Sequence, residues 1–280
     1  MTSFRAACVQ VNASNDMAAN IGAACALARE ARAEGADLVL LPENVAMMEW
    51  GRANVIAKAA PEETHPALAA FRDLARETGL WLHCGTLHVR VADGQGDDGR
   101  VANRSYLLDP TGETRARYDK IHMFDVDLGG GEVYRESATF APGGRAVTAD
   151  LPWGRLGLTV CYDVRFPHLY RALAKAGASF LAVPAAFTRT TGRAHWHVLL
   201  RARAIETGCY VLAPAQCGEH AGERQTYGHA VIVDPWGEVL ADAGEQPGFA
   251  IADIDSARVA EARRKVPSLE HDRAYAEAVR

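Results

Sequence analysis

The chain has 280 residues and a formal net charge of −5, and hydrophobic residues make up 49% of it, as in a globular protein with a sizeable core. No cluster of Lys and Arg with interleaved aromatic residues is present, which argues against nucleic acid as a partner. No run of about 18 apolar residues predicts a transmembrane helix. The first residues lack the pattern of a secretory signal, so the expected location is cytoplasmic, with no membrane partner.

Apolar periodicity and glycine stops predict alternating strands and helices in the first half of the chain. Residues 16–34 have the spacing of an amphipathic helix, and Gly35 follows them as a stop signal. Residues 66–78 form a second expected helix, closed by Gly79. The Asp-Pro-Thr-Gly turn at 109–112 is expected to join two strands as a hairpin. The expected strands cover residues 4–11, 36–41, 80–87, 105–108 and 113–118, with a polar turn at 94–99.

The second half of the chain continues the same alternation. Residues 167–176 and 193–207 are expected to form helices, and a glycine follows each of them. Because strands alternate with helices and no Pro- or Ser-rich linker interrupts them, the sequence predicts a single α/β domain over residues 1–280, with helices covering the sheets. The expected strands cover residues 156–160, 179–183, 210–215, 229–233, 238–241 and 249–254.

The six cysteines lack the spacing of a metal site or of a disulfide framework. Most of them lie in apolar runs, where a free cysteine packs as a small hydrophobic residue. Cys161 differs, because it follows a predicted strand and precedes a helix that is expected to start at Pro167. Strand ends usually carry the sites of α/β folds, and a nearby helix N-terminus favours a thiolate. Cys161 is therefore a candidate nucleophile, although a cysteine at a strand end can also simply pack.

Two charged residues occupy similar positions at the ends of strands. Glu43 follows the apolar strand at 36–41, where burial would raise its pKa and suit it to act as a base. Lys120 follows the strand at 113–118 beside apolar residues, where a desolvated ammonium group needs an anionic partner. Other interpretations stay open, since Glu43 can be a carboxylate at a helix start and Lys120 a surface lysine whose stem packs on apolar neighbours.

A thiol, a carboxylate and an ammonium group at three strand ends supply a nucleophile, a base and a cation, which are the groups that nucleophilic catalysis requires. No histidine is placed as in a Cys–His protease, but Glu43 can accept the thiol proton and later return it to leaving ammonia. Lys120 and backbone N–H groups can stabilise the oxyanion of the tetrahedral intermediate. The set predicts a thioester intermediate on Cys161, and it needs no metal and no organic cofactor.

The segments around these three residues are Leu41-Pro42-Glu43, Asp119-Lys120-Ile121-His122 and Cys161-Tyr162-Asp163-Val164-Arg165-Phe166-Pro167. Together they resemble the catalytic segments of the nitrilase superfamily, the carbon–nitrogen hydrolases. They occur in the order and at the spacing of that family, and the resemblance covers nearly the whole chain. It implies a four-layer α-β-β-α sandwich that carries a Glu-Lys-Cys triad.

The resemblance extends to further site residues. The stretch that begins at Glu136 is similar to a family segment with a second active-site glutamate, which implies that Glu136 bonds to Lys120 and helps to place the substrate. An opposite charge there would keep the lysine protonated, although Glu136 can also be an ordinary turn residue. The backbone N–H of Tyr162 is the implied second oxyanion donor. Arg165 can meet a substrate carboxylate, or hold the loop through Asp163 or another acid.

Two further features carry less information about the site. His195 and His197 lie two residues apart in an expected helix, so they do not share a face, and no metal site is predicted there. The expected specificity loop at 123–135 contains three consecutive glycines, which leave its conformation open.

Within the superfamily, the stretches 194–207, 216–218 and 227–229 most resemble the branch of amidases that act on deaminated glutathione and on ω-amides. This implies hydrolysis of a small carboxylate-bearing amide, with deaminated glutathione ahead of α-ketoglutaramate, by a homodimer or larger homo-oligomer. Nitrilase and N-carbamoyl amidohydrolase activities stay open as alternatives. Two non-catalytic readings also stay open, namely a thiol redox sensor at Cys161 and an interaction module with the same fold.

Overall fold

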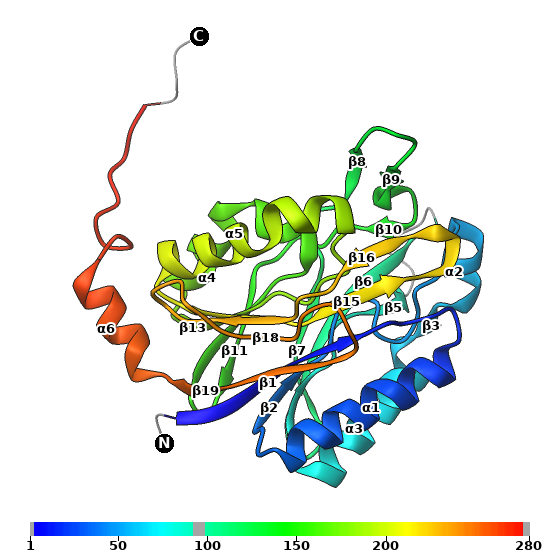
Figure 1. The fold of residues 1–280 in the computed structure, drawn as a ribbon, viewed down its shortest axis with the longest axis horizontal. Coiled ribbons are helices and arrows are strands. Elements are labelled where there is room, and N and C mark those ends of the chain that lie inside the picture. Colours follow the sequence, from blue (N-terminus) through cyan, green and yellow to red (C-terminus); the bar gives the residue numbers. More distant parts are fainter. Residues whose placement is uncertain (1–2, 92–98, 277–280) are drawn as a thin grey trace.

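Two β-sheets lie face to face in the computed structural model, and helices cover the outer face of each sheet (Figure 1). The structure describes residues 3–91 and 99–276. The four layers are those of the α-β-β-α sandwich expected from the sequence, and that prediction is confirmed. The polar turn predicted at 94–99 lies outside the described residues, apart from Gly99.

In the described part of the chain, the larger sheet contains eleven strands and is built around β1 (Ser3–Val11). Ala6 and Cys8 of β1 face the core between the two sheets, whereas Ala7 and Val9 face the core beneath the helices. Successive side chains of a strand point to opposite faces, so a strand buried on both faces has a continuously apolar sequence. The other strands of this sheet are β2 (Leu38–Leu40), β3 (Ala60–Pro61), β4 (Trp81–His83), β5 (Leu87–Arg90), β6 (Val101–Leu108), β7 (Thr114–Asp119), β10 (Phe140–Ala141), β15 (Ala215–Glu219), β16 (Gln225–Tyr227) and β19 (Gly248–Asp255).

The smaller sheet faces β1 across the core between the sheets. Phe180 and Tyr210 from this sheet and Tyr118 from the larger one are buried there. Burying a large apolar side chain stabilises a fold by roughly 1.5–3 kcal/mol, so this core holds the two sheets together. The strands of the smaller sheet are, in spatial order, β11 (Val147–Leu151), β12 (Gly154–Leu158), β13 (Ala178–Ala182), β14 (Tyr210–Ala213), β17 (Val231–Val233) and β18 (Val239–Asp242).

Two helices cover each sheet. Helices α1 (Met17–Ala33) and α3 (Pro66–Thr78) lie below the larger sheet in Figure 1, and α4 (Pro167–Lys175) and α5 (Arg189–Thr207) lie above the smaller one. All four were expected from the sequence, whereas the short helices α2 (Arg52–Lys58) and α6 (Ala257–Lys265) were not. No helix within residues 3–91 and 99–276 is long and apolar enough to cross a membrane.

Two predicted strands are each divided in the structure, so these predictions were wrong in detail. The run at 80–87 forms the end-to-end strands β4 and β5, which both pair with β6. Gly85 separates them, and a Cβ atom there would lie 1.9 Å from the carbonyl oxygen of Pro42. The run at 210–215 forms β14 in the smaller sheet and the start of β15 in the larger one. Pro214 lies between these two and has no N–H to donate to a sheet.

Two other parts of the chain adopt structure that the sequence left open. The loop at 123–135 forms a hairpin of β8 (Asp125–Asp127) and β9 (Val133–Arg135), which stands above the body in Figure 1. Its three glycines all have positive φ, between 62° and 89°, which explains why glycine is used there. Beyond α6, the chain extends away from the body toward the C-terminus (Figure 1).

Candidate active site

Three strand ends bring the predicted triad together. Glu43 follows β2 and Lys120 follows β7, both in the larger sheet, whereas Cys161 follows β12 in the smaller sheet. Nζ of Lys120 lies 2.9 Å from Oε1 of Glu43, and Cys161 lines the same cavity as these two residues. The site therefore lies at one end of the sandwich, where strands of both sheets meet.

Glu43 is held by donors from three parts of the chain. Its side chain is 2% exposed, and its Oε1 accepts hydrogen bonds from Nζ of Lys120 and, at 3.0 Å, from Nδ2 of Asn103. Its Oε2 accepts from the backbone N–H of Ala186 at 2.8 Å. These three donors satisfy the buried carboxylate and fix its orientation.

Lys120 has a second carboxylate partner, as the resemblance implied. Its Nζ donates to both oxygens of Glu136 at 2.8 Å, and Oε2 of Glu136 also accepts from the backbone N–H of Phe124 at 2.6 Å. Burial by itself lowers the pKa of Lys120, but the negative charges of Glu136 and Glu43 outweigh burial and raise it. The ammonium group therefore stays protonated at any physiological pH.

The pKa of Glu43 shifts in the direction opposite to the one expected from the sequence. Burial raises it, but the charge and hydrogen bond of Lys120 outweigh burial, and the pKa falls below its usual value. The resting carboxylate is therefore unprotonated and free to take a proton.

Cys161 lies in a strained turn at the start of the short 3₁₀ helix Cys161–Arg165. Its φ is +48°, a left-handed conformation that is uncommon outside glycine and is often found at functional sites. Burial and the nearby negative charge of Glu43 raise the pKa of the thiol. The helix α4 begins at Pro167 as expected, but burial dominates, so the pKa of the resting thiol is raised rather than lowered as a nearby helix N-terminus would favour.

A cavity of about 360 Å³ opens above these groups, within the size range of sites for small molecules. All six cysteines of the chain are buried, so burial does not distinguish Cys161, but its place in this cavity does. Carboxylates, cations and aromatic rings line the cavity together, including Glu43, Lys120, Glu136, Phe124, Tyr134 and Arg224.

Comparison with known proteins agrees with this geometry. Residues 5–264 match the family model described as carbon-nitrogen hydrolase. The chain belongs to the carbon-nitrogen hydrolase family. It is 43% identical to the deaminated glutathione amidase of Synechocystis sp. over 97% of this chain and 98% of that protein, and 42% identical to that of Homo sapiens over 94% and 80%. The crystal structure of the Caenorhabditis elegans NitFhit protein superimposes with a TM-score of 0.89 at 37% identity, over 98% of this chain and 66% of that one.

Tyr162 and Arg165 occupy different places in this carbon-nitrogen hydrolase. Tyr162 lines the cavity next to Cys161. Arg165 lies outside the lining residues, with its guanidinium 5.2 Å from the ring centre of Phe187 and one nitrogen 3.3 Å from Nδ1 of His195. Asp163 does not contact Arg165, because its carboxylate accepts from Tyr118, His122 and the N–H of Val160 instead.

Two residues that the sequence did not single out also shape the hydrolase site. Asn103 lies inside the buried strand β6, and its Nδ2 contacts Glu43 at 3.0 Å and Glu136 at 3.4 Å. Asn103 precedes the strand expected at 105–108, so no local pattern in the sequence marked it as a site residue. Arg224 lines the cavity, donates to the carbonyl of Ala186 at 2.9 Å, and has no partner for Nε among the described residues. Its loop carries no local signal that points to this cavity.

Proposed function

We propose that this carbon-nitrogen hydrolase releases ammonia from a small carboxylate-bearing amide, with deaminated glutathione preferred over α-ketoglutaramate. The observation that carries the proposal is the cavity in which Cys161, Glu43 and Lys120 meet beside a guanidinium group, that of Arg224. The relatives from Synechocystis sp. and Homo sapiens, named deaminated glutathione amidases, support the choice of substrate.

The first half of the reaction forms a thioester. Sγ of Cys161 attacks the amide carbon as its proton moves to Glu43, and the carbonyl electrons move to the oxygen. The raised pKa of the thiol and the unprotonated carboxylate beside it support this concerted transfer over a preformed thiolate. When the intermediate collapses, the C–N bond breaks, Glu43 returns the proton to nitrogen, and ammonia leaves.

The second half consumes the thioester. Glu43 takes a proton from water, the resulting hydroxide oxygen attacks the thioester carbon, and the C–S bond breaks as Sγ regains a proton. Lys120 and the backbone N–H of Tyr162 stabilise the oxyanion in both halves. Glu136 keeps Lys120 charged and oriented through the two contacts at 2.8 Å.

We assign recognition of the substrate carboxylate primarily to Arg224. Its guanidinium lines the cavity and stacks 5.7 Å from the ring centre of Tyr134, and no carboxylate of the described residues bonds to it. Arg165, the residue indicated by the sequence, remains the second candidate. Because a charge-assisted hydrogen bond contributes about 1.5–3 kcal/mol, Arg224→Gln should raise KM about 10–100-fold for carboxylate-bearing amides. It should leave KM nearly unchanged for a neutral amide of the same size.

Arg165→Gln is the matched control for this assignment. It removes the same charge from the turn beside the cavity, where Arg165 lies against Phe187. A larger rise in KM for Arg165→Gln than for Arg224→Gln would transfer carboxylate recognition to Arg165. Equal behaviour of both variants toward charged and neutral amides would contradict a carboxylate-bearing substrate.

A panel of substrates tests the proposed class of reaction. Deaminated glutathione, α-ketoglutaramate, a nitrile and an N-carbamoyl amino acid are compared by kcat/KM, and deaminated glutathione should lead. Faster turnover of the nitrile or the carbamoyl compound would replace the proposal. Intact-protein mass spectrometry should show an acyl adduct on Cys161 during turnover. A redox sensor or an interaction module would form none.

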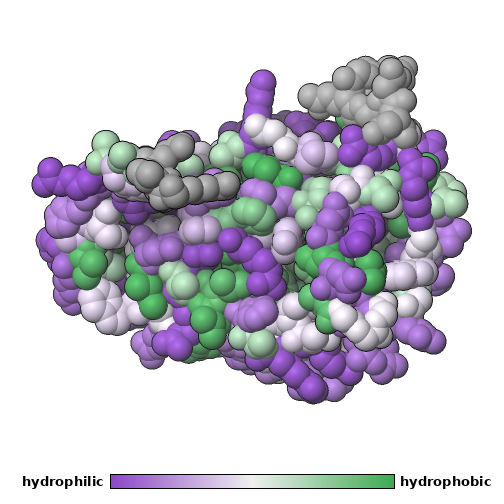
Figure 2. All heavy atoms as spheres, turned by 90° about the horizontal axis from the view of Figure 1, so that it is seen from above, coloured by the Kyte–Doolittle hydropathy of each residue, from purple (hydrophilic) through white to green (hydrophobic). Residues whose placement is uncertain are grey.

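We also propose that residues 1–280 act as one domain, located in the cytoplasm, and that the protein assembles as a homodimer or larger homo-oligomer. Val198 and Ile205 on α5 are 67% and 55% exposed, and their spacing of seven puts them on one helix face. Figure 2, the view from above, shows hydrophobic residues in groups among hydrophilic ones. Sedimentation at micromolar concentration should show at least a dimer, and a monomer alone would contradict this assembly.

A further inference from the structure

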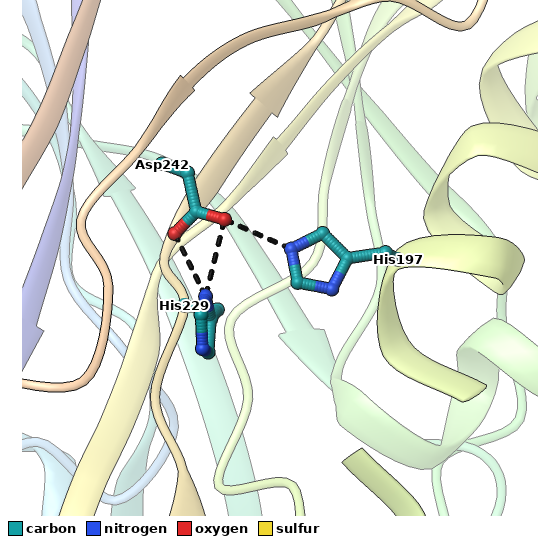
Figure 3. A group of neighbouring side chains, drawn as sticks. All are labelled: His197, His229 and Asp242. Atoms are coloured by element: carbon teal, nitrogen blue, oxygen red, sulfur yellow. Dashed lines mark hydrogen bonds and ion pairs between the residues drawn. The ribbon is translucent and has the colours of Figure 1, made fainter. Parts of the chain in front are cut away.

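Two histidines and an aspartate meet outside the active-site cavity. His197 comes from α5, His229 from the segment before β17, and Asp242 from the end of β18. Nε2 of His197 lies 2.9 Å from Oδ2 of Asp242, and Nδ1 of His229 lies 3.0 and 3.1 Å from its two oxygens (Figure 3). One ligand atom from each residue lies within 4.8 Å of the others.

We propose that His197, His229 and Asp242 bind a divalent transition-metal ion of the zinc type. Two imidazoles and one carboxylate are a usual set of protein ligands for Zn²⁺, with water in the fourth tetrahedral position. With metal–ligand bonds of about 2.0 Å, tetrahedral geometry separates ligand atoms by about 3.3 Å. The present N–O separations are within a few tenths of an ångström of this value, and the two imidazole nitrogens lie within 4.8 Å of each other, so side-chain movements complete the site.

The three ligands are already held in place by their surroundings. His229 has a φ of +56°, a strained conformation for a residue other than glycine, and its ring stacks on Tyr227 at 4.4 Å. Oδ1 of Asp242 accepts from the backbone N–H of Gly244 at 2.8 Å. The side chains of His197, His229 and Asp242 are 31%, 20% and 30% exposed, so an ion can enter directly from solvent.

The alternative explanation of this cluster is that it binds no metal ion and that the two imidazoles simply donate hydrogen bonds to one carboxylate. In that account each ring keeps a proton on the nitrogen that faces Asp242, whereas in the metal site the ion replaces these protons. The sequence alone did not show the cluster, because it offered only His195 as a neighbour of His197. The second histidine and the aspartate lie more than 30 residues away along the chain.

A bound ion would tie α5 to the smaller sheet. Nε1 of the buried Trp196 on α5 already donates to the carbonyl of His229 at 2.8 Å. An ion held by His197, His229 and Asp242 would add a further connection between this helix and the sheet. Ligands that bind only the folded state raise its stability, so the melting temperature should rise with ion concentration.

The test uses Zn²⁺ and a protein in which Cys161→Ala removes the thiol of the active-site cavity as a competing ligand. Calorimetry should show one Zn²⁺ bound per chain with a dissociation constant below about 10 μM, the affinity scale of a specific site. Co²⁺ in place of Zn²⁺ should give visible absorption bands typical of tetrahedral coordination. His197→Gln and Asp242→Asn should each weaken binding at least about 100-fold, because loss of a residue that only orients a ligand already costs 10–100-fold.

His195→Gln is the matched control, since it changes the other histidine of the same helix turn and should leave affinity unchanged. Folding of every variant is checked by its melting temperature without metal, and the use of two separate ligand variants guards against one that does not fold. Absence of binding in the parent protein would overturn the proposal. Equal binding by parent, His197→Gln and Asp242→Asn would overturn it as well.

Discussion

Replacing Glu43 with glutamine separates the chemical role of this carboxylate from its structural role. Glutamine has the same shape but only one acceptor oxygen, and it cannot take a proton from Cys161. In the structure, Oε1 of Glu43 accepts from Lys120 and Asn103, and Oε2 accepts from Ala186. An amide can accept on one side only, so its NH₂ group must face the donors on the other side.

The cost to stability follows from these contacts. The least unfavourable orientation directs the amide oxygen toward Lys120 and leaves the N–H of Ala186 unpaired, which costs about 1–3 kcal/mol. Lys120 keeps a partner, because Glu136 contacts it with both oxygens. The full penalty for an isolated buried charge, about 3–5 kcal/mol, is therefore avoided. For a protein of this size the melting temperature should fall by roughly 2–12 °C.

Glu43→Gln should lower the catalytic rate more than it lowers stability, because it removes the general base. Loss of a general base lowers the rate at least about 100-fold, and it should appear in kcat with little change in KM. The assay is steady-state release of ammonia from the best amide of the panel, alongside a thermal melt of the same preparation. A folded Glu43→Gln variant with kcat within tenfold of the parent would refute the assignment of Glu43 as the base.

Four further outcomes are expected. Cys161→Ala should abolish ammonia release and acyl-adduct formation but melt near the parent temperature, and residual turnover would contradict a covalent route. Lys120→Ala should lower kcat about 100–1000-fold and also destabilise the fold, because Glu43 and Glu136 then face each other without a cation. The pKa of Glu43 is depressed, so its contribution to stability is present above the unfolded value of about 4.3 and is lost as pH falls through the lower folded value. The difference in melting temperature between parent and Glu43→Gln should therefore shrink below about pH 4.3, and a difference that grows there would contradict the shift. Gly85→Ala should destabilise the fold by about 1–3 kcal/mol or more, measured by denaturant unfolding, because its φ is +59° and its Cβ would lie 1.9 Å from a carbonyl oxygen.

Most elements of the fold could be predicted because their signals are local. Gly79 and Gly208 end α3 and α5 in left-handed conformations, with φ of 69° and 61°, as the glycine stops predicted. The divided run at 210–215 could not be predicted in this way. Its residues are uniformly apolar up to Pro214, and its two halves pair with Val231–Val233 and with the end of β1, which are far apart in the chain.

The residues of the candidate site also differ in whether local sequence signals could reveal them. The positions of Glu43, Lys120 and Cys161 at strand ends were visible in the sequence, and the structure brings the three side chains together. Asn103 and Arg224 were missed, because nothing in their immediate neighbours shows that they approach the carboxylates and the cavity.

The sequence by itself determined most of the strands, the four helices that cover the sheets and the functional groups that stand at the strand ends, because periodicity and turn residues act over a few neighbouring positions. Only the tertiary structure decided how those groups behave. Burial acting alone would raise the pKa of Glu43, yet the pKa falls, because Lys120 lies 2.9 Å away after a separation of 77 residues. The cluster of His197, His229 and Asp242 likewise exists only because α5 packs on the smaller sheet. Electrostatic and coordination energies depend on distances in space, which local sequence patterns do not encode.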